Sequence, residues 1–152
     1  MARLRVLALA AARRRVGSVV LNGGTLLDWR ISDKAADSTE CAVAHVEKMI
    51  AEFQPDVVIT EEVTTARHKG KSTLAIIAAM GEAAEQNGHM AITLPREHRY
   101  ANKYAEAEAL VERFPELAPW KPERLHFYDN EPRNTVLFEA LALADQILAR
   151  ES

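Results

Sequence analysis

The chain contains a single cysteine, Cys41, so no disulfide can form within it. A chain without disulfides fits a reducing compartment, and we expect a cytoplasmic protein in which Cys41 packs as a small apolar residue. Long apolar stretches are also lacking. No run approaches the ~20 apolar residues that a membrane-spanning helix needs, so we expect no membrane partner.

A strong positive charge is absent as well. The 19 lysines and arginines are outnumbered by 22 aspartates and glutamates, which gives a net charge of −3. Any binding of nucleic acid must therefore use a local basic surface rather than the field of the whole molecule. The remaining composition, 48% hydrophobic and 27% charged, is ordinary for a globular protein. The length suits one domain with a real core, expected to span residues 1–152.

Three short apolar segments near the N-terminus predict β-strands at Leu4–Leu9, Gly17–Leu21 and Thr25–Ile31. Residues 10–15, three alanines followed by three arginines, are predicted to form the first turn. Asn22-Gly23-Gly24 is a strong hairpin signal, because Asn and Gly tolerate a positive φ. We therefore expect an antiparallel meander of three strands.

Helix and strand patterns alternate after the meander. Asp37 is predicted to cap a helix, with Glu40 completing a capping box, and Pro55 ends that helix. Its inner face is predicted to carry Val43, Val46, Ile50 and Phe53. The later predicted elements are a buried strand at Asp56–Thr60, a helix from Ser72 to Gln86, a strand at Met90–Leu94, a helix at Asn102–Phe114, an irregular segment at Pro115–Arg133, and a last helix capped by Asn134 or Thr135 and running through Arg150.

This order of elements predicts an α/β fold. Three antiparallel strands followed by two helix-linked parallel strands give a mixed five-stranded sheet with helices on both faces. The same order is found in the ribonuclease H-like topology. No internal repeat, low-complexity tract or second domain is visible in the sequence.

Two carboxylates, Glu61 and Glu62, follow the buried strand at Asp56–Thr60. The carboxyl end of a central strand in an α/β sheet is the usual place for a functional crevice, and a buried carboxylate needs a counter-ion or a metal. The alternative is a solvated loop that begins at Glu61. Adjacent residues of a strand point to opposite faces, so Glu62 could join Glu61 only if the chain bends after Thr60.

Basic residues gather in three loops that follow strands of the predicted sheet. If these loops share one edge of the sheet, their cations would bind the phosphates of a nucleic acid; the alternative is that each group is an ordinary solvated cluster. Gly70-Lys71-Ser72 resembles the end of a nucleotide-binding loop, but Thr65 stands where that pattern needs a glycine, so we expect no nucleotide cofactor. The candidate nucleic-acid-binding residues are Arg13, Arg14, Arg15, Arg67, His68, Lys69, Lys71, Arg96, His98, Arg99 and Lys103.

Spacing along the chain resembles that of the RuvC-type Holliday-junction resolvases. In that family Pro-Asp and four mostly apolar residues precede a metal-binding Glu, and here Pro55-Asp56 leads to Glu61, followed by Val63, Ala66 and Arg67. The last helix of the family carries two acidic residues three apart, and here Val136 and Glu139 hold those positions. Ala10, with Gly17 seven residues later, takes the position of the family's first-strand Asp. Thr64 replaces an aromatic residue that the family often inserts at the junction.

The resemblance implies a divalent metal site for phosphodiester hydrolysis, in which two Mg²⁺ ions roughly 4 Å apart clamp the reacting oxygens. Glu61 and Glu139 would be the metal ligands and, with Glu62 recruited, the catalytic carboxylates. Because Ala10 and Val136 offer no ligand, we expect at most one weakly held Mg²⁺ or Mn²⁺. The alternative, without a functional role for Glu139, is that this residue lies on the solvated side of an amphipathic helix with Thr135, Ala142 and Gln146.

Three functional hypotheses follow from the resemblance. The first is a RuvC-like protein of DNA recombination and repair that binds branched or duplex DNA as a homodimer, pairing through the helix at Ser72–Gln86, and cuts poorly or not at all. The second is an active, Mg²⁺-dependent Holliday-junction endonuclease with a reshuffled ligand set that adds Glu62 and Asp129. The third is a protein-interaction module that kept the fold and uses Pro115–Arg133 as its contact surface.

Overall fold

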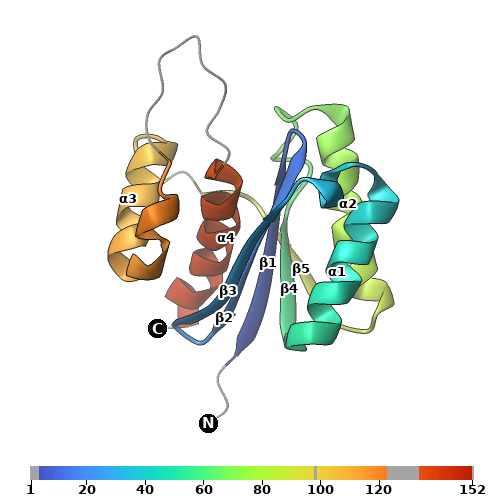
Figure 1. Ribbon diagram of the computed structural model, residues 1–152, viewed down its shortest axis with the longest axis horizontal. Helices are drawn as coiled ribbons and strands as arrows, with labels where there is room; N and C mark the ends of the chain where they lie inside the picture. The colour runs from blue at the N-terminus through green and yellow to red at the C-terminus, as the bar shows by residue number, and fades with distance from the viewer. Residues whose placement is uncertain (1–3, 98, 123–133, 152) are drawn as a thin grey trace.

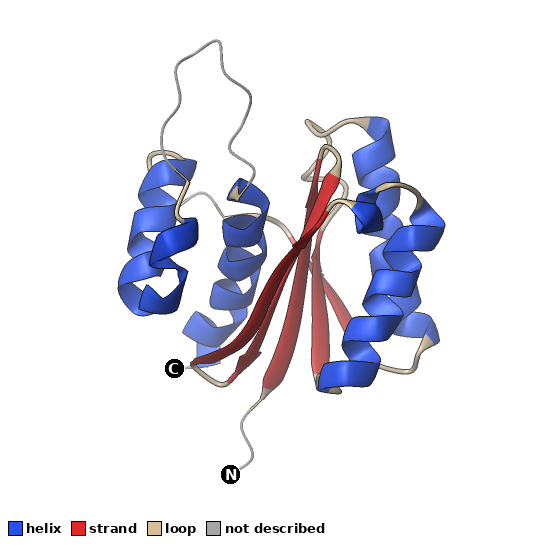
Figure 2. Ribbon diagram, in the orientation of Figure 1, coloured by secondary structure: helices blue, strands red, loops and turns tan. Residues whose placement is uncertain are grey.

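The computed structural model describes residues 4–97, 99–122 and 134–151, and for residues 149–151 it describes only the backbone helix. Five strands form one mixed sheet in the order β3-β2-β1-β4-β5. Helices α1 and α2 cover one face of the sheet, and α4 covers the other with α3 packed beside it (Figures 1 and 2). The predicted five-stranded mixed sheet with helices on both faces is confirmed.

The first three strands, β1 (Arg5–Ala12), β2 (Arg15–Asn22) and β3 (Thr25–Ser32), form the predicted antiparallel meander. The hairpin at Gly23 is confirmed, since its φ is 61°. The first turn is tighter than predicted. Residues 10–12 continue β1, because their backbone pairs with β2 as far as Ala12 and Arg15, and only Arg13 and Arg14 form the turn.

Strand β4 (Val57–Glu61) lies between β1 and β5 (Met90–Leu94) and runs parallel to both. All five of its residues are buried, as expected for a central strand that helices cover on both faces. The carboxyl ends of β1, β4 and β5 therefore lie at the same edge of the sheet.

Helix α1 (Thr39–Phe53) follows a short 3₁₀ helix, η1 (Lys34–Ala36), and begins one residue later than a cap at Asp37 predicts. Its N-cap is Ser38, whose Oγ accepts a hydrogen bond from the Cys41 amide at 3.1 Å, while Asp37 only ends η1. The inner face lies partly where it was predicted, because Val46 and Ile50 are buried and Val43 and Phe53 pack, partly buried, against the same core cluster. Its buried residues are Ala42, Val46, Met49 and Ile50, where Val43, Val46, Ile50 and Phe53 were predicted.

Helix α2 (Lys71–Gln86) begins one residue before the predicted cap at Ser72, with Gly70 as its N-cap. Helix α3 (Lys103–Arg113) lies within the predicted range Asn102–Phe114, and the structure shows Asn102 as its N-cap, whose side chain accepts hydrogen bonds from two amides of the first turn. The following segment contains a 3₁₀ helix, η2 (Pro115–Trp120), where irregular chain was predicted. Within the described residues, no helix has both the length and the apolar character required to cross a membrane.

Helix α4 (Thr135–Glu151) packs across β1 and β2. On β1, Val6, Ala8 and Ala10 belong to the core beneath α4, while the alternate residues face α1 and α2. Glu61 has the same parity as Val57 and Ile59, which also belong to the α4 side. The sheet therefore directs the Glu61 side chain toward α4.

Candidate functional site

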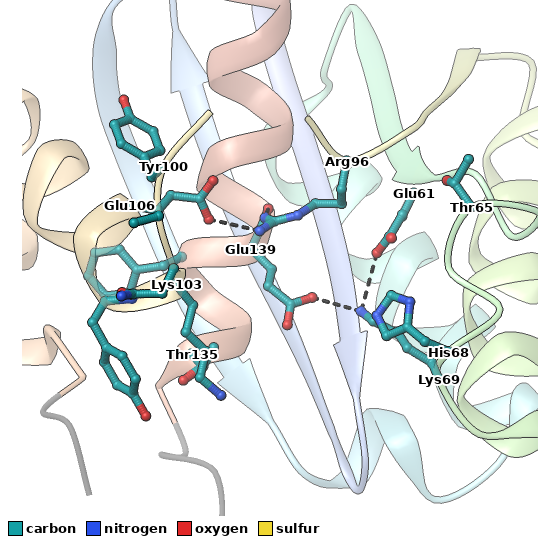
Figure 3. A pocket seen from close by; sticks show the side chains of 14 residues that line it. Glu61, Thr65, His68, Lys69, Arg96, Tyr100, Lys103, Glu106, Thr135 and Glu139 are labelled. Atoms are coloured by element: carbon teal, nitrogen blue, oxygen red, sulfur yellow. Dashed lines mark hydrogen bonds and ion pairs between the residues drawn. The ribbon is translucent and has the colours of Figure 1, made fainter. Parts of the chain in front are cut away.

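A pocket of about 610 Å³ opens at the edge of the sheet where β4 and β5 end (Figure 3). Its walls come from the end of β4, the loop at residues 62–70, the segment after β5, the start of α3 and the first turns of α4. The charged residues that line it are Glu61, His68, Lys69, Arg96, Lys103, Glu106 and Glu139. Residues far apart in the sequence thus meet in one cavity, and among them are both predicted metal ligands.

The ammonium of Lys69 lies between these two carboxylates. Its Nζ donates hydrogen bonds to Glu139 Oε2 at 2.7 Å and to the carbonyl oxygen of Ala11 at 2.8 Å, and it lies 3.2 Å from Glu61 Oε1 (Figure 3). The Lys69 side chain is only 12% exposed. We call Glu61, Glu139 and Lys69 the acidic centre. The Lys69 ammonium thus connects the loop at residues 62–70 to β1, β4 and α4.

Glu61 is the last residue of β4 and is 2% exposed, so the alternative of a solvated loop beginning at Glu61 is wrong. Its backbone pairs with Leu94 of β5, which keeps the residue in the sheet. Among the described residues, Glu61 Oε1 receives no well-aligned hydrogen bond, although it lies within ion-pair distance of Lys69. Among the residues that the structure describes, Lys69 is the one cation within ion-pair distance of this buried carboxylate.

Glu139 does not lie on a solvated helix face, so that alternative is also wrong. Its side chain is 15% exposed, and its neighbours Thr135, Ala142 and Gln146 on the same face are buried. Gln146 explains why this face is polar: its amide donates to the Pro95 carbonyl and accepts from the Glu97 amide. The polar side of α4 thus holds the segment that follows β5.

Arg96 was predicted to bind phosphate, but its guanidinium makes contacts inside the chain. It donates to Glu106 Oε1 at 2.8 Å and to the Glu139 carbonyl oxygen at 3.3 Å. The Arg96 and Glu106 side chains are 14% and 10% exposed. Arg96 therefore ties α3 to α4 along one wall of the pocket. Glu106 escaped the sequence prediction, although a carboxylate four residues before Leu110, on the buried side of α3, was a visible signal.

Other predicted cations lie on the surface around this edge. Arg13, Arg14, Arg67 and Lys71 are exposed, and they take part in none of the ion pairs between described residues. Arg15 is half-buried, Arg99 forms an exposed pair with Glu97, and Lys103 lies over the Tyr104 ring. His68 is exposed at the pocket, and His98 lies outside the described residues.

One hydrogen bond and one shared hollow show that the loops lie close together. Lys69, from the loop after β4, bonds the carbonyl of Ala11 near the end of β1. Arg14, in the turn after β1, shares a small hollow of about 160 Å³ with Ser72 and Thr73 at the start of α2. With Arg96 and Lys69 lining one pocket, the structure brings the three basic loops to one edge of the sheet. We call this edge, with its exposed cations Arg13, Arg14, Arg67 and Lys71, the basic rim.

The structure does not bring Glu62 into the acidic centre. The residue follows the last residue of β4, its amide donates to the Leu94 carbonyl, and it does not line the pocket. Its carbonyl accepts from the amides of Thr65 and Ala66, which starts the turn of the following loop. Asp129 lies outside the described residues.

The two positions where the resolvase pattern carries further acids are apolar core. Ala10 and Val136 are each 1% exposed and belong to the hydrophobic cluster under α4. Gly17, paired with Ala10 across β1 and β2, lets the α4 backbone approach closely at Val136. No group of three acidic, histidine or cysteine side chains suited to a metal occurs among the described residues. The donor set therefore does not fit a two-ion centre.

Comparison with known proteins gave matches among solved structures. No protein-family model and no curated protein matches the sequence. The Thermus thermophilus RuvC structure matches with 19% identity and a TM-score of 0.67, over 97% of this chain and 96% of RuvC. T. thermophilus RuvC in complex with a Holliday junction substrate matches with 18% identity and a TM-score of 0.63, over 98% and 96%.

The crystal structure of the yeast mitochondrial Holliday junction resolvase, Ydc2, matches with 10% identity and a TM-score of 0.57, over 99% of this chain and 82% of that protein. The three likenesses extend over nearly the whole chain, and the strand order and the position of the pocket agree with the resemblance noted in the sequence. The chain therefore has the ribonuclease H-like fold in the form adopted by the RuvC resolvases.

Proposed function

We propose that this protein binds branched or duplex DNA through the basic rim and that it cleaves DNA poorly or not at all. The observation that carries the proposal is the meeting of three cation-bearing loops at the edge of the sheet that holds the pocket. A fold neighbour has been solved in complex with a Holliday junction substrate, which favours DNA as the partner.

Electrostatics support a local rather than a global attraction. The net charge is −3, so the whole molecule repels a polyanion weakly, while the exposed Arg13, Arg14, Arg67 and Lys71 concentrate positive charge at one edge. Such side chains contact phosphates without reading bases. They therefore suit recognition of DNA shape, and the binding constant should fall steeply with salt.

Impaired cleavage is proposed from the chemistry of the acidic centre. A two-ion mechanism needs several carboxylates to offset the repulsion between the ions. Here Ala10 and Val136 are buried among apolar side chains, and the two remaining carboxylates share the Lys69 ammonium. A single Mg²⁺ or Mn²⁺ bound by Glu61 and Glu139 would have to displace Lys69 first.

We also propose a homodimer that pairs through α2. A groove of about 570 Å³ runs between α1 and α2 and is lined largely by small side chains, including Ala75, Ala78 and Ala79. Small residues allow a second helix to approach closely. Light scattering on the purified protein tests this proposal, and a monomer at every concentration measured would contradict it.

A gel shift at graded salt, comparing a four-way junction with a linear duplex of the same sequence, tests the DNA-binding proposal. We expect binding at low salt that weakens as salt rises, with the junction bound at least as tightly as the duplex. A matched protein with Arg67→Ala and Lys71→Ala should bind more weakly to both. Absence of binding to either DNA at low salt would contradict the proposal.

Cleavage is tested separately on a labelled junction with Mg²⁺ and with Mn²⁺. We expect no more product than from the Glu61→Gln variant. Efficient metal-dependent cleavage that is lost in Glu61→Gln would instead support an active endonuclease with a reshuffled ligand set. A protein-interaction module is less favoured, because Trp120 packs edge-on against Trp29 with ring centroids 5.4 Å apart and is occupied within the chain.

A further inference from the structure

We propose that the Lys69 ammonium is the resident cation of the acidic centre and takes the place that a divalent metal ion would hold. This inference does not depend on DNA binding. It concerns which positive charge offsets Glu61 and Glu139, and it accounts for the poor match between the donor set and a metal centre.

The geometry around Lys69 Nζ resembles that of a bound cation. Three oxygen atoms from three different elements surround it: Ala11 of β1 at 2.8 Å, Glu139 of α4 at 2.7 Å and Glu61 of β4 at 3.2 Å. An ammonium group has three donors, and contacts of 2.7–2.9 Å are typical of charge-assisted hydrogen bonds. One positive charge thus joins the two strands and the helix.

The loop that carries Lys69 is itself held in shape. The Glu62 carbonyl accepts the amides of Thr65 and Ala66, and the Lys69 amide donates to the Ala66 carbonyl at 2.9 Å. Ala66 is fully buried, which anchors the middle of the loop. Lys69 therefore enters the centre from a structured turn and does not need to be ordered by a ligand.

A metal ion and this ammonium exclude each other. Mg²⁺ binds oxygens at about 2.0–2.1 Å, so an ion shared by Glu61 and Glu139 would lie against Nζ, and the two cations would repel strongly in a partly buried site. Lys69 would then have to break its hydrogen bonds to Ala11 and Glu139, and its charge would move away from the two carboxylates. The protein supplies its own counter-ion at this position, and the centre is closed to metals in the resting state.

The chemical consequence is a loop whose shape does not depend on divalent cations. Lys69 fastens residues 62–70 to β1 and α4, and the same loop presents Arg67 and His68 at the surface. The positive charge that a metal-dependent relative would obtain from solution is here part of the chain.

Titration with Mn²⁺, followed by electron paramagnetic resonance of the free ion, tests the inference. We expect Lys69→Ala to bind Mn²⁺ at least about tenfold more tightly than the unaltered protein, because the cost of breaking the charged hydrogen bonds disappears. Adding Glu139→Gln to Lys69→Ala should abolish the gain, and Lys48→Ala, which removes an exposed lysine on α1, should show none. Equal Mn²⁺ binding with and without Lys69, whether strong or undetectable, would overturn the inference.

A second experiment uses the unaltered protein and so does not require a variant to fold. Acetylation of lysines is followed by mass spectrometry with and without Mn²⁺. We expect Lys69 to react at least about tenfold more slowly than exposed Lys48, because its ammonium must first leave charged hydrogen bonds. The protection should be the same with Mn²⁺ present. A Lys69 that reacts as fast as Lys48, or that loses protection when Mn²⁺ is added, would overturn the proposal.

Discussion

Gly17 of β2 lies directly against the backbone of Val136 in the first turn of α4. A Cβ at position 17 would stand 2.7 Å from the Val136 carbonyl oxygen and 2.8 Å from its carbonyl carbon. Contacts this short with backbone atoms cannot be relieved by a side-chain rotation. The glycine therefore sets how closely α4 approaches the sheet, and with it the position of Glu139, three residues farther along the helix.

Replacing Gly17 with alanine is expected to lower the free energy of unfolding by about 2 kcal/mol, the usual cost of overpacking a core. Urea denaturation measures the change. Gly24→Ala is the matched control, because a Cβ there meets nothing within 4 Å. A loss at position 17 no larger than at position 24 would show that α4 adjusts freely.

Replacing Lys69 with methionine should lower the free energy of unfolding by about 3 kcal/mol, since it leaves the buried Glu61 carboxylate without a counter-ion. The double variant Lys69→Met/Glu61→Gln should recover part of the loss, because the uncompensated charge is removed. Chemical denaturation of the three proteins provides the measurement. If the double variant is less stable than Lys69→Met alone, the uncompensated charge of Glu61 is not the cause of the loss.

The Arg96–Glu106 pair should couple strongly in a double-mutant cycle. Both side chains are largely buried, and we expect a coupling energy of about 2 kcal/mol in the unfolding free energy from the Arg96→Met and Glu106→Gln variants. The Arg99–Glu97 pair is a control from the same segment, with the Arg99 side chain 44% exposed. Exposed pairs contribute below about 1 kcal/mol, so equal coupling in the two pairs would contradict the difference in burial.

The salt dependence of DNA binding should identify the cations that contact phosphate. Arg14→Ala, Arg67→Ala and Lys71→Ala are each expected to reduce the slope of log K against log salt by about 1. Fluorescence anisotropy at several salt concentrations measures the slopes. Lys48→Ala on α1 is the control for the loss of one exposed positive charge, and it should leave the slope unchanged. Slopes that respond equally to all four variants would point to non-specific charge effects.

Stability should fall below neutral pH partly through His45. Burial, with smaller contributions from the positive charges of Arg30 and Lys48, holds the pKa of the His45 imidazole below its ordinary value of 6.5. The unfolded chain therefore takes up a proton at higher pH than the folded chain does. The contribution to stability is complete above pH 6.5 and is lost as the pH falls from there through the lower pKa of the folded state.

The His45→Gln variant should flatten this part of the curve of unfolding free energy against pH, and denaturation at a series of pH values compares the two proteins. Ser18 Oγ lies 3.4 Å from His45 Nε2, so glutamine can keep a polar contact with Ser18. A variant with the same slope below pH 6.5 as the unaltered protein would assign the loss to other groups.

Patterns that act within a few residues were read correctly from the sequence. The apolar run before Glu61 predicts β4, Asn22-Gly23 predicts the hairpin, and α3 forms within the predicted range Asn102–Phe114. Errors occurred where neighbours compete for one role. Ser38 rather than Asp37 caps α1, because either side chain could accept the same kind of hydrogen bond and only the course of η1 decides between them.

The sequence alone determined the order of elements, the buried strand that leads to Glu61, and the apolar residues Ala10 and Val136 at positions where the resolvase pattern has carboxylates. These depend on periodicity, turn chemistry and residue identity, which are local. Only the tertiary structure decided that Glu61 belongs to the strand, that Lys69 pairs with Glu139, 70 residues farther along the chain, as well as with Glu61, and that Arg96 pairs with Glu106. A lysine looks the same in sequence whether it faces solvent or a carboxylate, because its partner is chosen by the packing of distant elements.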